Sequence, residues 1–309
     1  MCIRDRSFIK YAINIAKRGE LHGFMGGGEY ALTIYEQHIR RRIVRIEREL
    51  KEIRKRRKLL DVKRKETGLY LISLTGYTGA GKTSLFNLLT GESKYIDGRP
   101  FATLSTVSRK IKINGLPVLI SDTIGFIDST PPLLLEAFYT TLSELHLADL
   151  IAIMVDGSEG LDEVKRKLTS SLKILENIGV LYKNKIIVVN KIDLMTRKEL
   201  DNVINYVKTL DIPYVYISVK EKINIEKLKQ IILDNLPSLS RFVIKLSLKN
   251  THIISDLCRN SKVEYITWTK DSVLMNIVSR KELIAAKDKL IKVIREIPYV
   301  QSVCPKAWT

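Results

Sequence analysis

The pattern of apolar and polar residues changes character twice along the chain. Over residues 30–66 the segment is highly charged, and its apolar residues recur at alternating spacings of four and three: Ile39, Ile43, Ile46, Leu50, Ile53 and Leu60. This pattern predicts one long helix with a narrow apolar seam, as in a coiled coil. Such a helix needs a partner to bury the seam, and Ser7–Arg18 is the expected partner. Residues 1–68 are therefore predicted to form a basic helical hairpin.

From Leu69 onward, short apolar runs alternate with segments of helical periodicity. The sequence predicts a helix from Lys82 to about Thr90, and strands at 69–75, 107–113, 117–121, 150–155, 185–189 and 214–217. Asn114-Gly115 is a strong signal for a two-residue hairpin, so one strand is expected to be antiparallel. Residues 69–238 are predicted to form an α/β domain with a mostly parallel sheet, covered by helices on both faces.

Residues 239–309 are predicted to form a small α+β domain. We expect strands and helices in the order β-α-β-β-α-β, at 242–248, 251–260, 263–269, 272–279, 281–297 and 299–304. This order is typical of a ferredoxin-like domain. The chain is thus predicted to have three domains, at 1–68, 69–238 and 239–309.

The net charge of +18 is unevenly distributed. Residues 1–68 hold 19 basic and 9 acidic side chains, residues 69–238 hold 20 and 19, and residues 239–309 hold 13 and 6. Basic ends around a nearly neutral middle favour a polyanionic partner such as nucleic acid, although lysine-rich surfaces also simply keep proteins soluble. The candidate RNA contacts are the clustered cations of the long helix: Arg40, Arg41, Arg42, Arg54, Arg56, Arg57 and Lys58.

Composition excludes several classes of protein. No stretch approaches the ~18 consecutive apolar residues of a membrane span. The three cysteines (Cys2, Cys258 and Cys304) are far apart and form no CxxC pair. This spacing excludes a disulfide scaffold and a zinc finger, and it fits a reducing cytoplasm. We therefore expect a cytoplasmic, monomeric protein without a membrane partner.

The stretch GYTGAGKT lies between a predicted strand and a predicted helix, and it matches the phosphate-loop pattern G-x-x-x-x-G-K-[ST]. Its glycines let backbone N–H groups surround the phosphates. Lys82, a predicted catalytic residue, would neutralise β- and γ-phosphate oxygens, and the Thr83 hydroxyl would ligate Mg²⁺. The candidate phosphate-binding residues are Gly76, Tyr77, Thr78, Gly79, Ala80, Gly81, Lys82, Thr83 and Ser84.

The stretch NKID (Asn190–Asp193), at the end of a later predicted strand, favours guanine over adenine. The Asp193 carboxylate can accept both N–H donors of the guanine edge, whereas adenine would leave it facing unmatched groups. The aliphatic stem of Lys191 would lie alongside the base. Ser218-Val219-Lys220 resembles the short loop that supports guanine from the other side.

The stretch DTIGF (Asp122–Phe126) is predicted to contact the metal ion and the γ-phosphate. Asp122 would hold Mg²⁺ through water, and the backbone N–H of Gly125 would sense the γ-phosphate as the second predicted catalytic group. Phe101-Ala102-Thr103-Leu104 suits a mobile loop whose threonine caps Mg²⁺, with Phe101 among the nucleotide-binding residues. The predicted Mg²⁺ ligands are Thr83, Thr103 and Asp122. Together these motifs predict a guanine-nucleotide switch.

The chain resembles the HflX family of ribosome-associated GTPases over about residues 20–235. The similar stretches are Gly26–Tyr30, Gly76–Asn87, Phe101–Arg109 and Asp122–Leu145. The resemblance implies an N-terminal domain that ends in a helical hairpin, a GTPase domain joined to it, and binding to the large ribosomal subunit. In bacterial relatives it also implies ribosome splitting or rescue.

Two features depart from this family. Gly79 stands where members usually have an asparagine that can help to bind potassium, so the resemblance does not extend to potassium-stimulated hydrolysis. Most of the N-terminal domain expected before the hairpin is missing, which indicates an N-terminally truncated member.

Phe126 stands where many GTPases carry a glutamine that orients the attacking water. A phenyl ring has no donor or acceptor for that task, and HflX proteins typically have a hydrophobic residue here. One interpretation is a retracted ring with slow turnover until a partner completes the site. The other is a packing residue, with the water positioned elsewhere on the enzyme.

Two hypotheses of function follow. The first is a GTP-hydrolysing protein that binds the large ribosomal subunit and rRNA under control of its nucleotide state. The second is an RNA-binding ribosome-assembly factor or scaffold that needs GTP binding but little hydrolysis. A GTPase of tRNA modification or of membranes is disfavoured, because the sequence has no cysteine-rich tail and no amphipathic anchor.

Overall fold

The computed structural model describes residues 27–91, 107–122, 126, 145–288 and 290–299 of the chain. By their internal contacts the residues form two compact units, 1–62 and 63–309. Most of the 40-residue helix α2 (Gly27–Glu66) belongs to the first unit and confirms the predicted long helix. Its expected partner, Ser7–Arg18, lies outside the described residues. The hairpin and the division into three domains therefore stay predictions.

The larger unit contains a six-stranded sheet with the strand order β2-β3-β1-β4-β5-β6. Its strands are β1 (Tyr70–Gly76), β2 (Val107–Ile113), β3 (Leu116–Asp122), β4 (Leu150–Asp156), β5 (Asn184–Asn190) and β6 (Tyr214–Tyr216). Only β2 pairs antiparallel, with β3. Asn114 and Gly115 between them have φ values of 47° and 87°, as a two-residue hairpin turn requires. The predicted mostly parallel sheet is confirmed.

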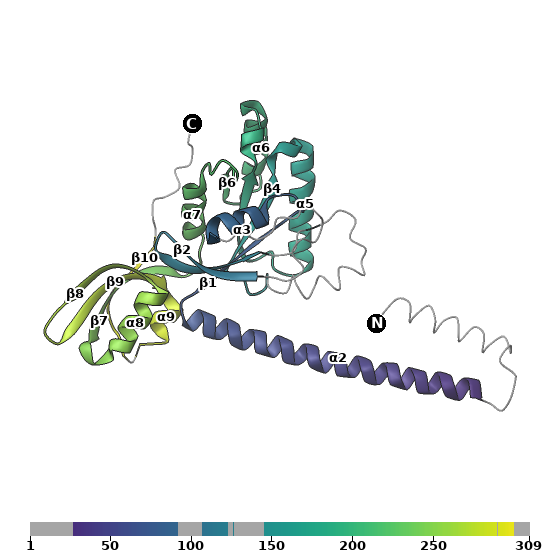
Figure 1. Cartoon of the computed structure of the whole chain (residues 1–309), viewed down its shortest axis with the longest axis horizontal. Helices are drawn as coiled ribbons and strands as arrows, with labels where there is room; N and C mark the ends of the chain where they lie inside the picture. Colours follow the sequence, from purple (N-terminus) through teal and green to yellow (C-terminus); the bar gives the residue numbers. More distant parts are fainter. Residues whose placement is uncertain (1–26, 92–106, 123–125, 127–144, 289, 300–309) are drawn as a thin grey trace. The chain divides into compact units, whose positions relative to one another are not determined.

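Helices cover both faces of this sheet (Figure 1). Helices α3 (Lys82–Thr90) and α7 (Ile225–Asp234) contribute to one apolar core, and α5 (Leu161–Asn177) and α6 (Arg197–Lys208) contribute to the other. All residues of β1 and β4 are buried, as central strands of a covered parallel sheet must be. The loops that follow the parallel strands share the carboxyl edge of the sheet, where ligands of α/β proteins bind.

A four-stranded antiparallel sheet follows, with the strand order β10-β7-β9-β8. Its elements are β7 (Leu239–Ser247), α8 (Thr251–Asn260), β8 (Lys262–Trp268), β9 (Ser272–Arg280), α9 (Lys281–Ala285) and β10 (Lys292–Pro298). The elements follow the predicted order β-α-β-β-α-β, but the last strand lies at 292–298 and not at the predicted 299–304. Among the described residues, no helix has both the length and the apolar character needed to cross a membrane.

The helix predicted at 281–297 is wrong in its length. Helix α9 ends at Ala285, and residues 292–298 form β10, which pairs with β7 and has an irregular register between Val293 and Arg295. The apolar spacing of this segment fits a helix, but its β-branched residues favour a strand, and pairing with β7 decides between the two. The strand predicted at 299–304 falls almost wholly outside the described residues.

Asp149, which directly precedes β4, joins three elements through its carboxylate. It accepts hydrogen bonds from Arg64 of α2 at 2.5 Å, from Arg280 of β9 at 2.8 Å, and from the Leu71 N–H of β1 at 2.8 Å. The Asp149 side chain is only 5% exposed. Burial raises the pKa of this carboxyl, but the hydrogen bond from Arg280 and the charges of both arginines outweigh burial and lower the pKa below its usual value.

Replacing Asp149 should destabilise the protein strongly. Asp149→Ala removes the carboxylate that the buried guanidinium groups of Arg64 and Arg280 share, although Arg280 retains its ion pair with Glu282 at 3.1 Å. Losing this shared carboxylate costs about 3–5 kcal/mol of unfolding free energy. Urea unfolding measures this loss. The control is Glu163→Ala, which breaks the half-exposed pair with Arg166 and should cost under about 1 kcal/mol. Equal losses in the two variants would contradict the role of Asp149.

Candidate functional site

The loop between β1 and α3 depends on two glycines. Gly76 and Gly81 have φ values of 131° and 93°, and a Cβ there would lie 2.1 Å from the Met154 carbonyl oxygen and 2.3 Å from Asn190 Nδ2, respectively. Only glycine fits such positions. Gly81 caps α3 without a side-chain hydrogen bond. The first N–H groups of α3 therefore remain available to an anion.

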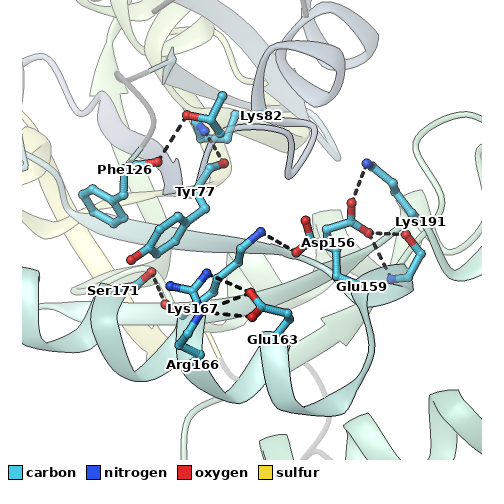
Figure 2. Close-up of polar contacts among 12 residues, drawn as sticks. Tyr77, Lys82, Phe126, Asp156, Glu159, Glu163, Arg166, Lys167, Ser171 and Lys191 are labelled. Carbon is cyan, nitrogen blue, oxygen red and sulfur yellow. Dashed lines mark hydrogen bonds and ion pairs between the residues drawn. The ribbon is translucent and has the colours of Figure 1, made fainter. Parts of the chain in front are cut away.

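Lys82 is the first residue of α3, and its buried side chain reaches back to the main chain at the start of this loop. Its Nζ donates to the carbonyl oxygens of Gly76 at 2.9 Å and Tyr77 at 2.8 Å; Figure 2 shows Lys82 beside Tyr77. Burial lowers the pKa of Lys82 to about 8, although the charge of Asp122 opposes this shift. Burial therefore destabilises the ammonium form of Lys82 relative to that of an exposed lysine, and a bound anion would stabilise it.

Thr83 and Asp122 meet beside the loop, where the Thr83 hydroxyl donates to Asp122 Oδ2 at 3.0 Å. A hydroxyl and a carboxylate suit Mg²⁺, which usually completes its shell with water and phosphate oxygens. Within the described ranges, no group of three or more His, Cys, Asp or Glu residues could hold a metal ion. Thr103, Phe101 and Gly125 lie outside these ranges.

Asn190, at the end of β5, tethers the phosphate loop to the loop at residues 218–220. Its Nδ2 donates to the Ala80 carbonyl oxygen at 2.9 Å, and its Oδ1 accepts from the Val219 N–H at 3.1 Å. The Ser218 hydroxyl accepts from the Glu221 N–H at 3.0 Å, while Lys220 is exposed. Two segments that the sequence predicts to bind one nucleotide are therefore held together by one amide.

Asp193 lies in a short 3-10 turn that follows β5, Ile192–Leu194. Its Oδ1 is buried and has no hydrogen-bond partner within the part of the chain that the structure describes. A buried carboxylate oxygen without a donor is costly. The position therefore suits a ligand that brings N–H groups, as the guanine edge does.

Asp156, at the end of β4, is a site residue that the sequence motifs missed. Its Oδ2 lies 2.5 Å from Lys191 Nζ, and its Oδ1 accepts from the Ser158 N–H and hydroxyl (Figure 2). Lys191 has a φ of 65°, and its ion pair with Asp156 fixes its stem. No sequence motif marks Asp156. Its place in the site follows from the strand register, because Asp156 pairs with Asn190 at the shared edge of two parallel strands.

Phe126 packs its buried ring edge-on against Tyr77, with centroids 6.1 Å apart. Its N–H donates to the Gly76 carbonyl oxygen, and its own carbonyl oxygen accepts from the Thr78 N–H. Lys167 and Arg166 of α5 lie over the Tyr77 ring at 5.6 and 5.9 Å, as Figure 2 shows. The Phe126 ring thus packs in the core; its effect on turnover stays a prediction.

Residues 71–191 match a family model described as a 50S ribosome-binding GTPase, and residues 11–64 match one described as the middle region of GTP-binding GTPases. The "GTPase HflX" of Thermofilum pendens is 43% identical over 91% of this chain and 67% of its own length. That of Methanocaldococcus jannaschii is 38% identical over 81% and 63%. The chain thus spans about two thirds of the length of these relatives.

Among solved structures, the chain is similar to a GTP-binding protein from the hyperthermophilic archaeon Sulfolobus solfataricus in complex with GDP. The identity is 31%, the TM-score is 0.48, and the match covers 73% of this chain and 62% of that one.

Nucleotide binding should take up protons near pH 8. Lys82 has a pKa of about 8, and a bound diphosphate would raise it by stabilising the ammonium form. About half of the free protein then lacks this proton at pH 8, so GDP binding should take up about half a proton and weaken at higher pH. Calorimetry in buffers of different ionisation enthalpy measures the uptake at pH 7 and pH 8. Uptake that does not grow between these pH values would contradict the prediction.

Proposed function

Because the chain belongs to the HflX family of GTPases, which are GTP-hydrolysing enzymes, we propose that its nucleotide state controls binding to the large ribosomal subunit and its rRNA in the cytoplasm. The observation that carries the proposal is the meeting of the phosphate loop, Asp122 and Asn190–Asp193 at one edge of the sheet. The description of the matched family model and the basic helix α2 support the ribosomal part.

In this proposal the phosphates lie against the N–H groups of residues 76–84 and the ammonium of Lys82. Thr83 and, through water, Asp122 would hold Mg²⁺, and Thr103 would join them when the γ-phosphate is present. A bound Mg²⁺ would neutralise charge on the phosphates. The Gly125 N–H would sense the γ-phosphate, as the sequence motif predicts.

Guanine occupies the opposite end of this site. Asp193 accepts the base's N–H donors, the stem of Lys191 lies along the base, and Ser218-Val219-Lys220 supports it from the other side. The tether through Asn190 supports this arrangement, because it fixes the distance between the phosphate and base loops.

Hydrolysis without a partner should be slow, because the buried ring of Phe126 offers no polar group to the attacking water. We infer that ribosome binding lies in a different part of the chain, because residues 1–68 are strongly basic. Arg40, Arg41 and Arg42 of α2 are exposed, and we infer that these residues, with Arg54, Arg56, Arg57 and Lys58, contact rRNA phosphates.

Asp193→Asn should weaken GTP binding and shift the preference toward xanthine nucleotides. The new amide donates a hydrogen bond, which the 2-oxo group of xanthine can accept and the 2-amino group of guanine cannot. Competition binding with GDP and XDP measures the preference. Asp201→Asn, at an exposed position of α6, is the control and should leave it unchanged. An unchanged preference in Asp193→Asn would overturn the assignment of this loop.

Removing the helix cations should weaken ribosome binding and flatten its salt dependence. Each lost phosphate contact reduces the magnitude of the negative slope of log K against log salt by about 1. Arg40→Gln, Arg41→Gln and Arg42→Gln together should therefore reduce this magnitude by up to about 3. Co-sedimentation with purified large subunits, in GDP or a non-hydrolysable GTP analogue, measures binding across a salt series. GTP affinity itself should hardly change.

The matched control removes three exposed cations of α6 instead, through Arg197→Gln, Lys198→Gln and Lys208→Gln. This variant has the same net charge but should keep the parent slope. If both variants behave alike, α2 does not make the rRNA contacts. If the parent chain binds the large subunit equally in both nucleotide states, or not at all, the proposed function is wrong.

A further inference from the structure

Two helices cover one face of the small sheet. The other face packs against the core of the parallel-sheet region at the end that carries Val278 and has exposed residues at its other end; this second face is called the open face below. Helices α8 and α9 pack on the face that carries Phe242, Ile244 and Met275, and Figure 1 shows both helices on the same side of this sheet. Because side chains alternate along a strand, the neighbouring residues point to the other face. There the strand register aligns two rows, Lys292-Lys245-Leu274-Thr267 and Arg295-Val243-Asn276-Tyr265.

Two lysines lie directly opposite each other on this open face. Lys245 of β7 pairs in register with Lys292 of β10, and both are exposed. Like charges directly opposite each other on antiparallel strands are destabilising. The exposed Arg295 follows on the same face of β10. The stability of the sheet therefore does not explain this cluster, whereas a bound polyanion would.

Four acidic side chains of this region are paired with other cations, and Asp271 lines one hollow together with Lys245 and Lys292. Arg241, the next cation along β7, pairs with Glu264 at 2.8 Å. Asp256, Glu282 and Glu296 pair with Lys287, Arg280 and Lys281, in that order. Among the described residues, no ion pair involves Lys245, Lys292 or Arg295. Their positive charge is therefore available to a ligand.

An aromatic side chain lies at the other side of the open face. Tyr265 of the edge strand β8 is 64% exposed, and the register of β8 shifts just before it, between Val263 and Tyr265. Such bulges re-aim side chains and are common next to functional sites. From β10 to β8 the sheet spans three strand spacings, or about 14 Å. The face thus combines cations on one side with a stacking surface on the other.

We propose that this open face binds single-stranded nucleic acid. Phosphates lie over Lys245, Lys292 and Arg295, a base stacks on the ring of Tyr265, and the amide of Asn276 lies between them. Cations that follow the backbone together with an aromatic platform are how sequence-tolerant single-strand binding works. An acidic polypeptide would use the cations but would leave the exposed ring without a role.

The full chain is tested by fluorescence anisotropy with labelled, unstructured RNA of about 12 nucleotides, and with DNA of the same sequence. Tyr265→Ala should weaken binding about tenfold, whereas Tyr265→Phe, which keeps the ring, should bind like the parent. Tyr182→Ala is the matched control, because Tyr182 is 78% exposed in the GTPase domain, and it should change nothing. In an RNA that contains 4-thiouridine, photo-crosslinks should map to Tyr265.

Lys245→Gln with Lys292→Gln should lower the salt slope by about 1.4, since each single-strand phosphate contact contributes about 0.7. Lys198→Gln with Lys208→Gln is the charge-matched control. Parent-like binding of Tyr265→Ala would overturn the proposal. So would a double lysine variant that loses binding to polyglutamate but not to RNA, because the partner would then be an acidic protein. Free oligonucleotides make this test independent of ribosome association, and weaker binding of DNA would indicate that the 2′-hydroxyl contributes.

Discussion

The candidate nucleotide site depends on one side-chain amide, that of Asn190. It donates to the main chain of the phosphate loop and accepts from the main chain of the base-side loop. An aspartate could not donate, and a leucine could do neither. The tether also explains Gly81, since a Cβ there would lie 2.3 Å from the amide nitrogen. The phosphate loop, the end of β5 and the loop at 218–220 are therefore held together by this single side chain.

The central strands β1 and β4 have the candidate nucleotide site at their carboxyl ends and the ion pairs of Asp149 at their amino ends. Strand β1 begins beside the ion pairs of Asp149 and ends at the phosphate loop, while β4 begins after Asp149 and ends at Asp156. Both strands are buried throughout. The last turn of α2, through Arg64, and the end of β9, through Arg280, are thus fastened to the strands that position the nucleotide site.

The sequence predicted those features in which short-range chemistry decides the structure. Apolar runs located the strands, Asn114-Gly115 predicted the hairpin, and the glycine-rich motif located the phosphate loop. Features that depend on tertiary pairing were missed. The strand β10 has the apolar spacing of a helix, and only its pairing with β7 decides otherwise. Asp156 and Asp149 lie in no motif, and their importance comes from partners 35 and 85 residues away in the chain.

Net charge differs between the regions of the chain, and the total of +18 does not reveal this difference. The region at 69–238 is nearly neutral. This suits the proposed nucleotide site, in which the affinity would come from buried groups such as Lys82. Diffuse surface charge would add little there and would attract other polyanions. In the C-terminal region most acidic side chains form ion pairs within the fold. The excess cations, such as Lys245, Lys292 and Arg295, are exposed on the surface. Lys245 and Lys292 are the clearest example of this exposed positive charge, because the strand register places them directly opposite each other.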